Sequence, residues 1–435
     1  MSDLSLVDGP VPLLFNVLAV LGGLWLLAGG RRLWLRAVAP ALLGGIAGMA
    51  LLWYLAEEAY GWWDESFPRL LYLWAGAAVA AAILLVPRLL AGRGILRRVA
   101  TVMAVLCVFL AAVAQANVQY ALFPTVASVF TVEGLSAGSI TAVVGSRPPD
   151  SPAPPATTES NWMPPPDMPA HGSVYRAAIP GTVSGYRGND AYVYLPPAYL
   201  ADPEGSNLPV LVLIHGRPGG SDSWTSSGKL AAAMDSYAAA HRGLAPVVVM
   251  PDLSMGGASR WPLCLDSRVA RSATYLGVDV PAWVRGTLGA GTAGKRQWAI
   301  GGLSSGGTCA LQLAVNFPQA YPTFLDLSGE SEPSVHGGRD RLVREYFDGD
   351  PDAFAAQNAQ DVLARRTFPG TAGRFVAGIE DNKYENELDP LYAAARKAGM
   401  QVRFDKVPGT HSWHMWAAEL PRQMPWLMQR TGLVR

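Results

Sequence analysis

The sequence contains few charged residues and no recognisable metal-binding pattern. Charged residues make up 16% of the 435 positions, which is low for a soluble protein. The formal net charge is zero, so no nucleic-acid partner is expected. The six histidines and three cysteines show no metal-ligand spacing, and no cofactor is expected.

The apolar residues are concentrated before residue 125, and the second half has the composition of a globular domain. The length also indicates at least two structural units. Because no basic segment precedes the first apolar run and no small-residue cleavage site follows it, we expect a retained helix and not a signal peptide. Each run has about the 20 residues needed to cross ~30 Å of hydrocarbon. The four runs are Val11–Gly29, Ala37–Tyr54, Leu70–Leu90 and Val99–Leu122.

The connections between these runs differ in charge. The first and third connections are basic, and the second is acidic. Basic connections stay in the cytoplasm, so the N-terminus and everything after the fourth run are expected outside. No acidic or basic residue lies at the centre of a run, which favours an anchor over an ion path. A groove that presents lipid to the second half is the alternative. The charged residues are Arg31, Arg32 and Arg36, then Glu57, Glu58, Asp64 and Glu65, then Arg88, Arg93, Arg97 and Arg98.

A proline-rich stretch, Arg147–Pro169, separates the apolar part from the globular part. It has few residues that form a core, which predicts an extended spacer. The expected organisation is therefore a four-helix transmembrane region over 1–125, a spacer over 126–170 and a globular domain over 171–435.

Short apolar runs alternate with helical stretches in the globular part. This alternation predicts an α/β domain with a mostly parallel sheet and helices on both faces. The active site of such a sheet lies beyond the carboxyl ends of its strands. Helices are expected over Lys229–His241 and Thr308–Phe317. Strands are expected in Asp190–Leu195, Pro209–Gly216, Ala245–Asp252, Arg296–Gly302, Thr323–Gly329, Gly373–Asp381 and Gln401–Gly409.

Ser304 is the candidate nucleophile. It is the serine of a G-x-S-x-G motif that follows one of these strands and precedes a helix. A sharp strand-to-helix turn needs small neighbours and exposes the serine at its apex. The N-terminal end of the helix also places a positive dipole near developing negative charge.

A histidine and a carboxylate follow the serine in the order that such hydrolases use. His411 comes after the last strand and is the candidate base, with His414 as its competitor. Asp381 ends the preceding strand and is the candidate acid that orients the imidazole, with Glu380 as the alternative.

Two backbone N–H groups are expected to form an oxyanion hole. One belongs to Ser305, the residue after the nucleophile, and the other to the loop after the strand that ends at His215. Arg217 is the candidate there, because Pro218 has no N–H. His215 itself is interpreted as a structural residue of this loop.

Cys264 and Cys309 both fall in the globular part. If this part lies outside the cytoplasm, it meets an oxidising environment. Cys309 is also one helical turn beyond the candidate nucleophile. We predict a disulfide between the two cysteines, and two buried thiols are the alternative.

Four motifs resemble the esterase D-like branch of the α/β hydrolases, which includes feruloyl esterases and secreted mycolyltransferases. They lie at Gly216, Ser304, Asp381 and His411, and the likeness covers about residues 172–430. The resemblance implies an α/β-hydrolase fold. It also implies roles as nucleophile, acid, base and oxyanion donors for Ser304, Asp381, His411, Arg217 and Ser305.

The motif around His411 is especially similar to that of the mycolyltransferases. Those enzymes have an Asp-Gly-Leu-Arg stretch for trehalose where this chain has His215-Gly216-Arg217-Pro218, so trehalose binding is not carried over. The expected function is a serine esterase that acts on a lipid or cell-envelope ester. The alternatives are an acyltransferase that uses a sugar or polyol acceptor, and a non-catalytic envelope-binding protein.

Overall fold

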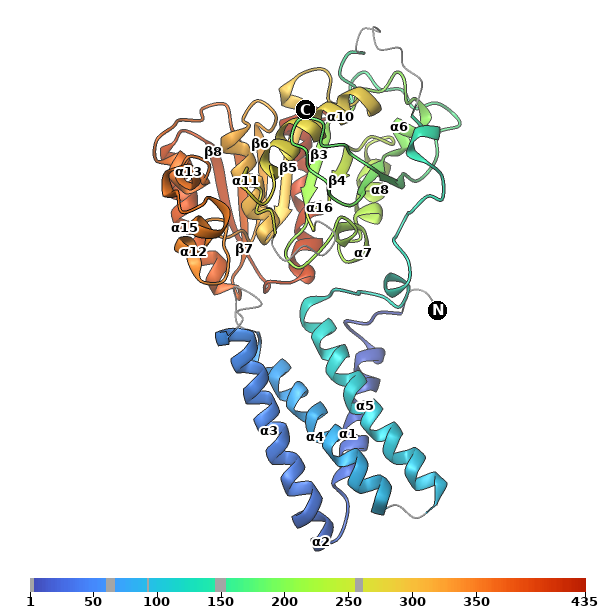
Figure 1. Ribbon diagram of the computed structural model, residues 1–435. Helices are drawn as coiled ribbons and strands as arrows, with labels where there is room; N and C mark the ends of the chain where they lie inside the picture. Colours follow the sequence, from blue (N-terminus) through green and yellow to red (C-terminus); the bar gives the residue numbers. More distant parts are fainter. Residues whose placement is uncertain (1–3, 60–66, 92–93, 145–153, 255–260) are drawn as a thin grey trace. The chain divides into compact units, whose positions relative to one another are not determined.

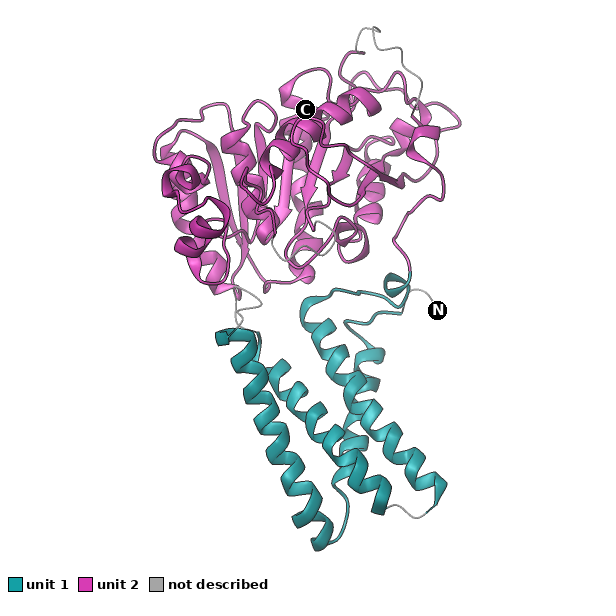
Figure 2. Ribbon diagram, in the orientation of Figure 1, with its two compact units in different colours: residues 1–130 teal, residues 131–435 magenta. Residues whose placement is uncertain are grey.

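The computed structural model describes residues 4–59, 67–91, 94–144, 154–254 and 261–435. The chain forms two compact units, Met1–Phe130 and Thr131–Arg435 (Figures 1 and 2). The described part of the first unit is built from long helices, and the second unit is built around an eight-stranded sheet.

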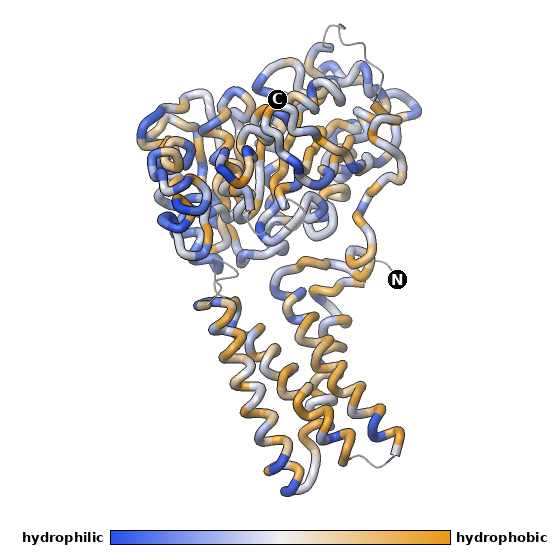
Figure 3. Tube along the Cα trace, in the orientation of Figure 1, coloured by the Kyte–Doolittle hydropathy of each residue, from blue (hydrophilic) through white to orange (hydrophobic). Residues whose placement is uncertain are grey.

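Long helices with mostly apolar residues make up the first unit (Figure 3). Four of them are long and apolar enough to cross a membrane, as the sequence predicts. The second is continuous from Arg31 to Ala59, with π-helical turns on either side of its α-helical centre. The bounds are α1, Pro10–Leu27; α2, Arg31–Leu33; α3, Ala39–Trp53; α4, Arg69–Ala91; and α5, Ile95–Tyr120.

Small residues allow these helices to approach closely. Helix α1 packs on α5, and α4 packs on both α3 and α5. A Cβ atom added to Gly45 would lie 2.6 Å from the carbonyl oxygen of Gly76, and one added to Gly22 would lie 2.8 Å from that of Ala104. Backbones in contact at glycine are typical of helix pairs that associate in lipid, where packing replaces the hydrophobic driving force.

Arg88 joins the ends of two helices. Its guanidinium, near the end of α4, donates to the carbonyl of Leu26 at 3.0 Å and also to those of Trp25 and Ala28. The last carbonyls of a helix have no partner within the helix and carry partial negative charge, so a cation is favourable there. The C-terminal ends of α1 and α4 therefore lie at the same end of the bundle.

The second unit contains one twisted sheet in the order β1-β2-β4-β3-β5-β6-β7-β8 (Figure 1). β1 and β2 run antiparallel to their neighbours, and the six strands from β4 to β8 along this order are parallel. Strands β2 to β6 are buried at every residue, as expected of strands that are covered on both faces. The strands are β1, Ser173–Ala177; β2, Ala191–Leu195; β3, Val210–Ile214; β4, Val247–Met250; β5, Trp298–Leu303; β6, Thr323–Leu327; β7, Ala372–Gly378; and β8, Gln401–Val407.

Helices cover both faces of this sheet. α11 packs on β3, β5 and β6, whereas α16 packs on β5 and β6 from the other face, together with α8 (Figure 1). The predicted mostly parallel sheet covered on both faces is confirmed. The helices are α6, Pro197–Ala201; α7, Ser223–Ser226; α8, Leu230–Ala240; α9, Ser272–Thr274; α10, Val280–Trp283; α11, Ser305–Asn316; α12, Gly338–Tyr346; α13, Pro351–Ala355; α14, Ala359–Leu363; α15, Asn382–Lys397; and α16, Trp413–Thr431.

Part of the stretch that the sequence presents as a spacer is packed within the second unit. The N–H of Thr157 donates to the carbonyl of Asn207, and that of Glu159 donates to the carbonyl of Leu433. The indole of Trp162 is buried and donates to the carbonyl of Arg242. The proline-rich composition does not predict these three hydrogen bonds. Residues 154–169 therefore differ from the expected extended spacer. Residues 145–153 lie outside the described part of the chain.

Candidate active site

The serine of the G-x-S-x-G motif lies at the turn between β5 and α11. Its backbone has φ 52° and ψ −127°, a conformation that L-residues rarely adopt and that is typical of functional sites. The N–H of Ser304 donates to the carbonyl of Leu327 at 2.8 Å, which ties the turn to the neighbouring strand β6. The turn therefore has the geometry expected of a nucleophile elbow.

The glycines of this motif are required by close backbone contacts. A Cβ atom on Gly302 would lie 2.1 Å from the carbonyl oxygen of Gly306, because the chain reverses so sharply between them. A Cβ atom on Gly306 would lie 2.3 Å from the carbonyl oxygen of Ile214, at the end of β3. Any larger residue at either position would push Ser304 out of place.

His411 and Asp381 contact each other at the carboxyl ends of the last two strands. Nδ1 of His411 lies 2.9 Å from Oδ2 of Asp381. Because a carboxylate only accepts, Nδ1 carries the proton in this pair and Nε2 is the basic nitrogen. The carboxylate of Glu380 instead accepts from the N–H of Gly409, and His414 is exposed on α16. The geometry thus favours Asp381 and His411 over their competitors.

Two aromatic rings hold the imidazole of His411. Tyr384, on α15, stacks on it with ring centres 3.9 Å apart and an interplanar angle of 15°. Trp416, on α16, meets it edge to face at 4.7 Å. The sequence analysis did not find these two residues, although both lie within five positions of a residue that it selected. They restrict the imidazole to one plane.

The loop after β3 passes directly beside Ser304. A Cβ atom on Gly216 would lie 3.4 Å from the Cβ atom of Ser304 and 2.6 Å from a methyl group of Leu303. The N–H of Arg217, the next residue, belongs to this loop. Ser305 opens α11, where the first N–H groups of a helix have no partner within the helix. The two proposed oxyanion donors therefore come from segments that flank the nucleophile.

The end of β4 holds this loop in position. Nε2 of the buried His215 accepts from the N–H of Leu253, and Nδ1 contacts the carbonyl of Gly216. Burial lowers the pKa of His215, so the ring stays neutral. Asp252 accepts from both the N–H and the hydroxyl of Ser221. His215 acts as a structural residue in this arrangement, and Asp252 is a supporting residue that the sequence analysis missed.

Three comparisons identify the family. The family model described as "Putative esterase" matches residues 187–427. The chain belongs to this esterase family. An uncharacterized protein of Corynebacterium glutamicum is 37% identical over 408 residues, which cover 90% of each chain. That alignment extends beyond the family match into the helical unit.

Two solved structures share the fold of the esterase. A ferulic acid esterase is 18% identical with a TM-score of 0.53, covering 60% of this chain and 99% of its own. An S-formylglutathione hydrolase from Agrobacterium tumefaciens is 18% identical with a TM-score of 0.50, covering 61% and 98%. The predicted α/β-hydrolase fold and the resemblance to esterases are confirmed. By its family the protein is an esterase.

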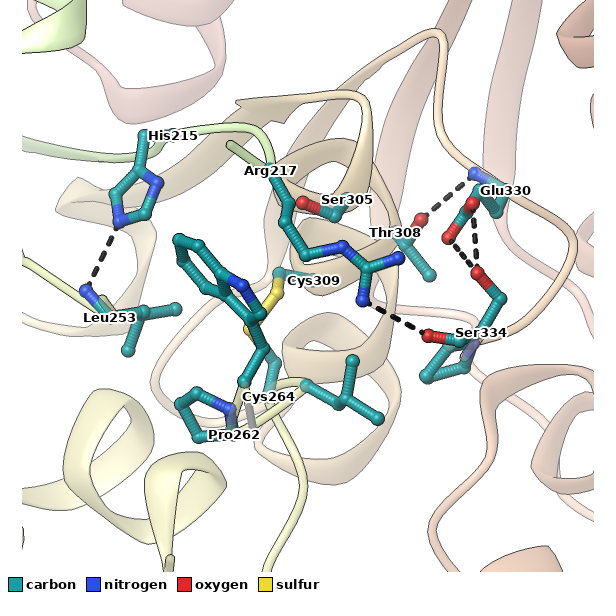
Figure 4. Close-up of a pocket in the computed structure, with 13 residues that line it drawn as sticks. His215, Arg217, Leu253, Pro262, Cys264, Ser305, Thr308, Cys309, Glu330 and Ser334 are labelled. Carbon is teal, nitrogen blue, oxygen red and sulfur yellow. Dashed lines mark hydrogen bonds between the residues drawn. A yellow bond between two sulfur atoms is a disulfide. The ribbon is translucent and has the colours of Figure 1, made fainter. Parts of the chain in front are cut away.

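A small pocket opens beside the loop after β3 (Figure 4). Its walls include Arg217 after β3, Trp261 after β4, Ser305 on α11 and Glu330 after β6. The two cysteines paired in the sequence analysis, Cys264 and Cys309, are joined by a disulfide that forms part of the wall. Among the described residues, no group of three or more His, Cys, Asp or Glu side chains is placed to hold a metal ion.

A buried carboxyl group lies behind the elbow of the esterase. Asp326, in β6, is fully buried, and its Oδ1 accepts from the N–H of Gly329 at 2.8 Å. A Cβ atom on Gly307, in the first turn of α11, would lie 2.3 Å from the same oxygen. Burial raises the pKa of Asp326 to about 8, because no charge partner offsets the lost hydration. The carboxyl group is therefore neutral at neutral pH.

Replacing Asp326 by Asn should stabilise the esterase more at pH 8 than at pH 5. Between the unfolded pKa near 4 and the folded pKa of about 8, the wild-type unfolded state loses the proton that the folded state keeps. Wild-type stability therefore falls as pH rises through this window, and Asn removes that loss. Thermal unfolding midpoints of both proteins at the two pH values measure the effect. If the midpoints of the two proteins differed by the same amount at pH 5 and at pH 8, Asp326 would be ionised in the folded protein at both pH values.

Proposed function

We propose that this protein is a membrane-anchored, extracytoplasmic serine esterase with Ser304, His411 and Asp381 as its catalytic triad. The observation that carries the proposal is the 2.9 Å contact between His411 and Asp381. It lies at the same edge of the sheet as a serine held at positive φ. Serine, acid and histidine follow in the chain order that this fold uses.

The proposed reaction proceeds in two acyl-transfer steps. Nε2 of His411 takes the hydroxyl proton of Ser304 as Oγ forms a bond to the ester carbonyl carbon. The bond to the alcohol oxygen then breaks, and His411 returns the proton to that oxygen. Water attacks the acyl-enzyme in the same way, which releases the carboxylic acid and restores the serine. Asp381 stabilises the imidazolium that forms in each step.

The carbonyl oxygen becomes negatively charged in both steps and needs fixed donors. We assign these to the backbone N–H groups of Arg217 and Ser305, supported by the close approach of Gly216 to Ser304. Loss of one such donor in related enzymes costs about 10²- to 10³-fold in rate. The contacts of Asp252 and His215 that fix the loop after β3 thereby act on the transition state through Arg217.

The first unit is proposed to anchor the enzyme in a membrane. It has four helices of sufficient length and hydropathy. We propose a transmembrane region over 1–125, with the catalytic domain of 171–435 extended by the packed residues 154–169. An enzyme attached at a bilayer surface meets lipids and envelope components, so we propose an ester of such a component as its substrate.

The catalytic domain is expected on the extracytoplasmic side. The supporting observation is that α1 and α4 end together at Arg88, close in the chain to the basic residues of the first and third connections. A reporter that is active only in the cytoplasm should therefore stay silent when it is fused after Arg435. The same reporter fused after Arg36 should be active. The reverse pattern would place the catalytic domain in the cytoplasm.

The proposed substrate class is tested with the full-length protein in detergent on a panel of acyl esters and envelope lipids. Ser304→Ala protein prepared in the same way gives the background. Serine-dependent release of a carboxylic acid from at least one envelope lipid supports the proposal. Activity on soluble esters alone would leave the esterase assignment intact but remove the envelope substrate.

A further inference from the structure

We infer that the pocket beside the loop after β3 binds the acyl part of the ester and admits only a short acyl group. The expected acyl length is roughly two to four carbon atoms. This inference rests on the proposed function and specifies its substrate class. It is argued from the position of the pocket, its size, the rigidity of its wall and the charge at its far end.

The position of the pocket selects the acyl side of the ester. His411 must return a proton to the alcohol oxygen, so the alcohol lies on the histidine side of the carbonyl carbon. The pocket is lined by Arg217, Trp261, Ser305 and Glu330 and by other residues of the same segments, which follow β3, β4, β5 and β6. Among the lining residues that the structure describes, none comes from the segments after β7 and β8, which carry the proposed acid and histidine. The pocket therefore receives the substituent that points away from His411.

The size of the pocket limits the acyl group. Its interior volume is about 30 Å³, room for only a few atoms, since one water needs roughly 10–15 Å³ on the same measure. The apolar residues that line this space include Trp261, Pro262, Leu263 and Pro333. An acetyl to butyryl group fits such a space, whereas an octanoyl group extends beyond it.

The wall that carries Trp261 is fixed in place. The disulfide between Cys264 and Cys309 ties it covalently to α11, one helical turn after Ser305. Leu263 and Cys264 both have positive φ, a local strain that persists only where surrounding structure imposes it. The buried hydroxyl of Ser272 also lies within hydrogen-bond distance of the carbonyl of Pro262 at 3.0 Å. The backbone from Pro262 to Cys264 is therefore held in place beside Trp261.

The far end of the pocket is polar. The guanidinium of Arg217 donates to the carbonyl of Ser334 at 3.3 Å (Figure 4). The hydroxyl of Ser334 lies 2.9 and 3.0 Å from the two carboxylate oxygens of the buried Glu330. A longer alkyl chain would have to cover these groups and remove what remains of their hydration, which costs free energy without a compensating bond.

The experiment measures kcat/KM of the full-length protein on 4-nitrophenyl esters from acetate to dodecanoate, below their critical micelle concentrations. We expect a maximum between acetate and butyrate, and a decrease of at least about tenfold from butyrate to octanoate. A flat profile, or a maximum at octanoate or longer, would overturn the inference. If Ser304→Ala abolished turnover in that case, the proposed function would still stand.

The variant Trp261→Ala locates the limit at this pocket. It should raise the octanoate-to-acetate ratio of kcat/KM about tenfold or more, because the indole occupies the space that the longer chain needs. The matched control is Trp426→Ala. Trp426 is on α16, where its indole lies against the guanidinium of Arg374, and it does not line the pocket. Its ratio should equal that of the wild type. Equal ratios in the two variants would contradict the assignment of the acyl pocket.

Discussion

Replacing Ser304 by Ala should reduce ester hydrolysis by about 10⁴- to 10⁶-fold, since loss of a triad nucleophile has this effect in related hydrolases. Ala removes only the hydroxyl oxygen, so the backbone at φ 52° and the N–H bond to Leu327 should remain. The variant should therefore fold as the wild type does. Initial rates on a soluble ester, at matched amounts of protein in detergent, measure the loss.

Ser305→Ala is the matched control for this prediction. It removes the same hydroxyl group one residue later, while the backbone N–H that is proposed to bind the oxyanion stays in place. Its activity should remain within about an order of magnitude of the wild type, because no transition-state donor is removed. If Ser304→Ala keeps more than a few per cent of activity, or if Ser305→Ala is the inactive variant, the elbow is assigned to the wrong serine.

The strands from β2 to β8 can be predicted from the sequence, whereas the edge strand β1 cannot. Strands β3 to β6 are continuous apolar runs because both of their faces are covered by helices. β1 was not predicted. It has five residues, among them the exposed Arg176, and it is defined by pairing with β2, a long-range contact that no local pattern reports. The packing of Trp162 against the rest of the second unit is also a long-range contact, so no local pattern predicts it.

The candidate triad can be predicted because each of its residues lies within four positions after the end of a strand. Parallel strands bring their carboxyl ends to one edge, so local motifs at Ser304, Asp381 and His411 predict a common site. The acyl pocket has no such signature. Trp261 and Glu330 lie in loops after different strands and meet only through the fold. Asp326 was also missed as a functional candidate, because a single carboxyl group inside an apolar strand does not indicate what it contacts.

The disulfide could be predicted from the sequence only in part. Cys107 lies within α5, so only two cysteines remain in the second unit. The sequence therefore identifies the pair, and the structure places it 5.5 Å apart at Cα. What the sequence does not indicate is that the bond also forms a wall of the pocket beside the nucleophile.

Replacing Asp381 by Asn should reduce kcat by about 10⁴-fold, the effect of the equivalent change in a well-studied serine protease. The amide is nearly isosteric, so the side chain still fills the buried space beside His411. It cannot stabilise the imidazolium that forms during catalysis. It can also donate to Nδ1, and Nε2 would then hold the proton and lose its ability to act as a base. A large loss of kcat with little change in KM is therefore expected.

Glu380→Gln is the matched control, because it makes the same chemical change in the adjacent side chain. Glu380 accepts from the N–H of Gly409, and the amide oxygen of Gln accepts from the same group. Activity should stay within about threefold of the wild type, since only an exposed charge is lost. If Glu380→Gln lost activity and Asp381→Asn kept it, the imidazole would be oriented by Glu380 during turnover, and the 2.9 Å contact of His411 with Asp381 would not be the catalytic arrangement.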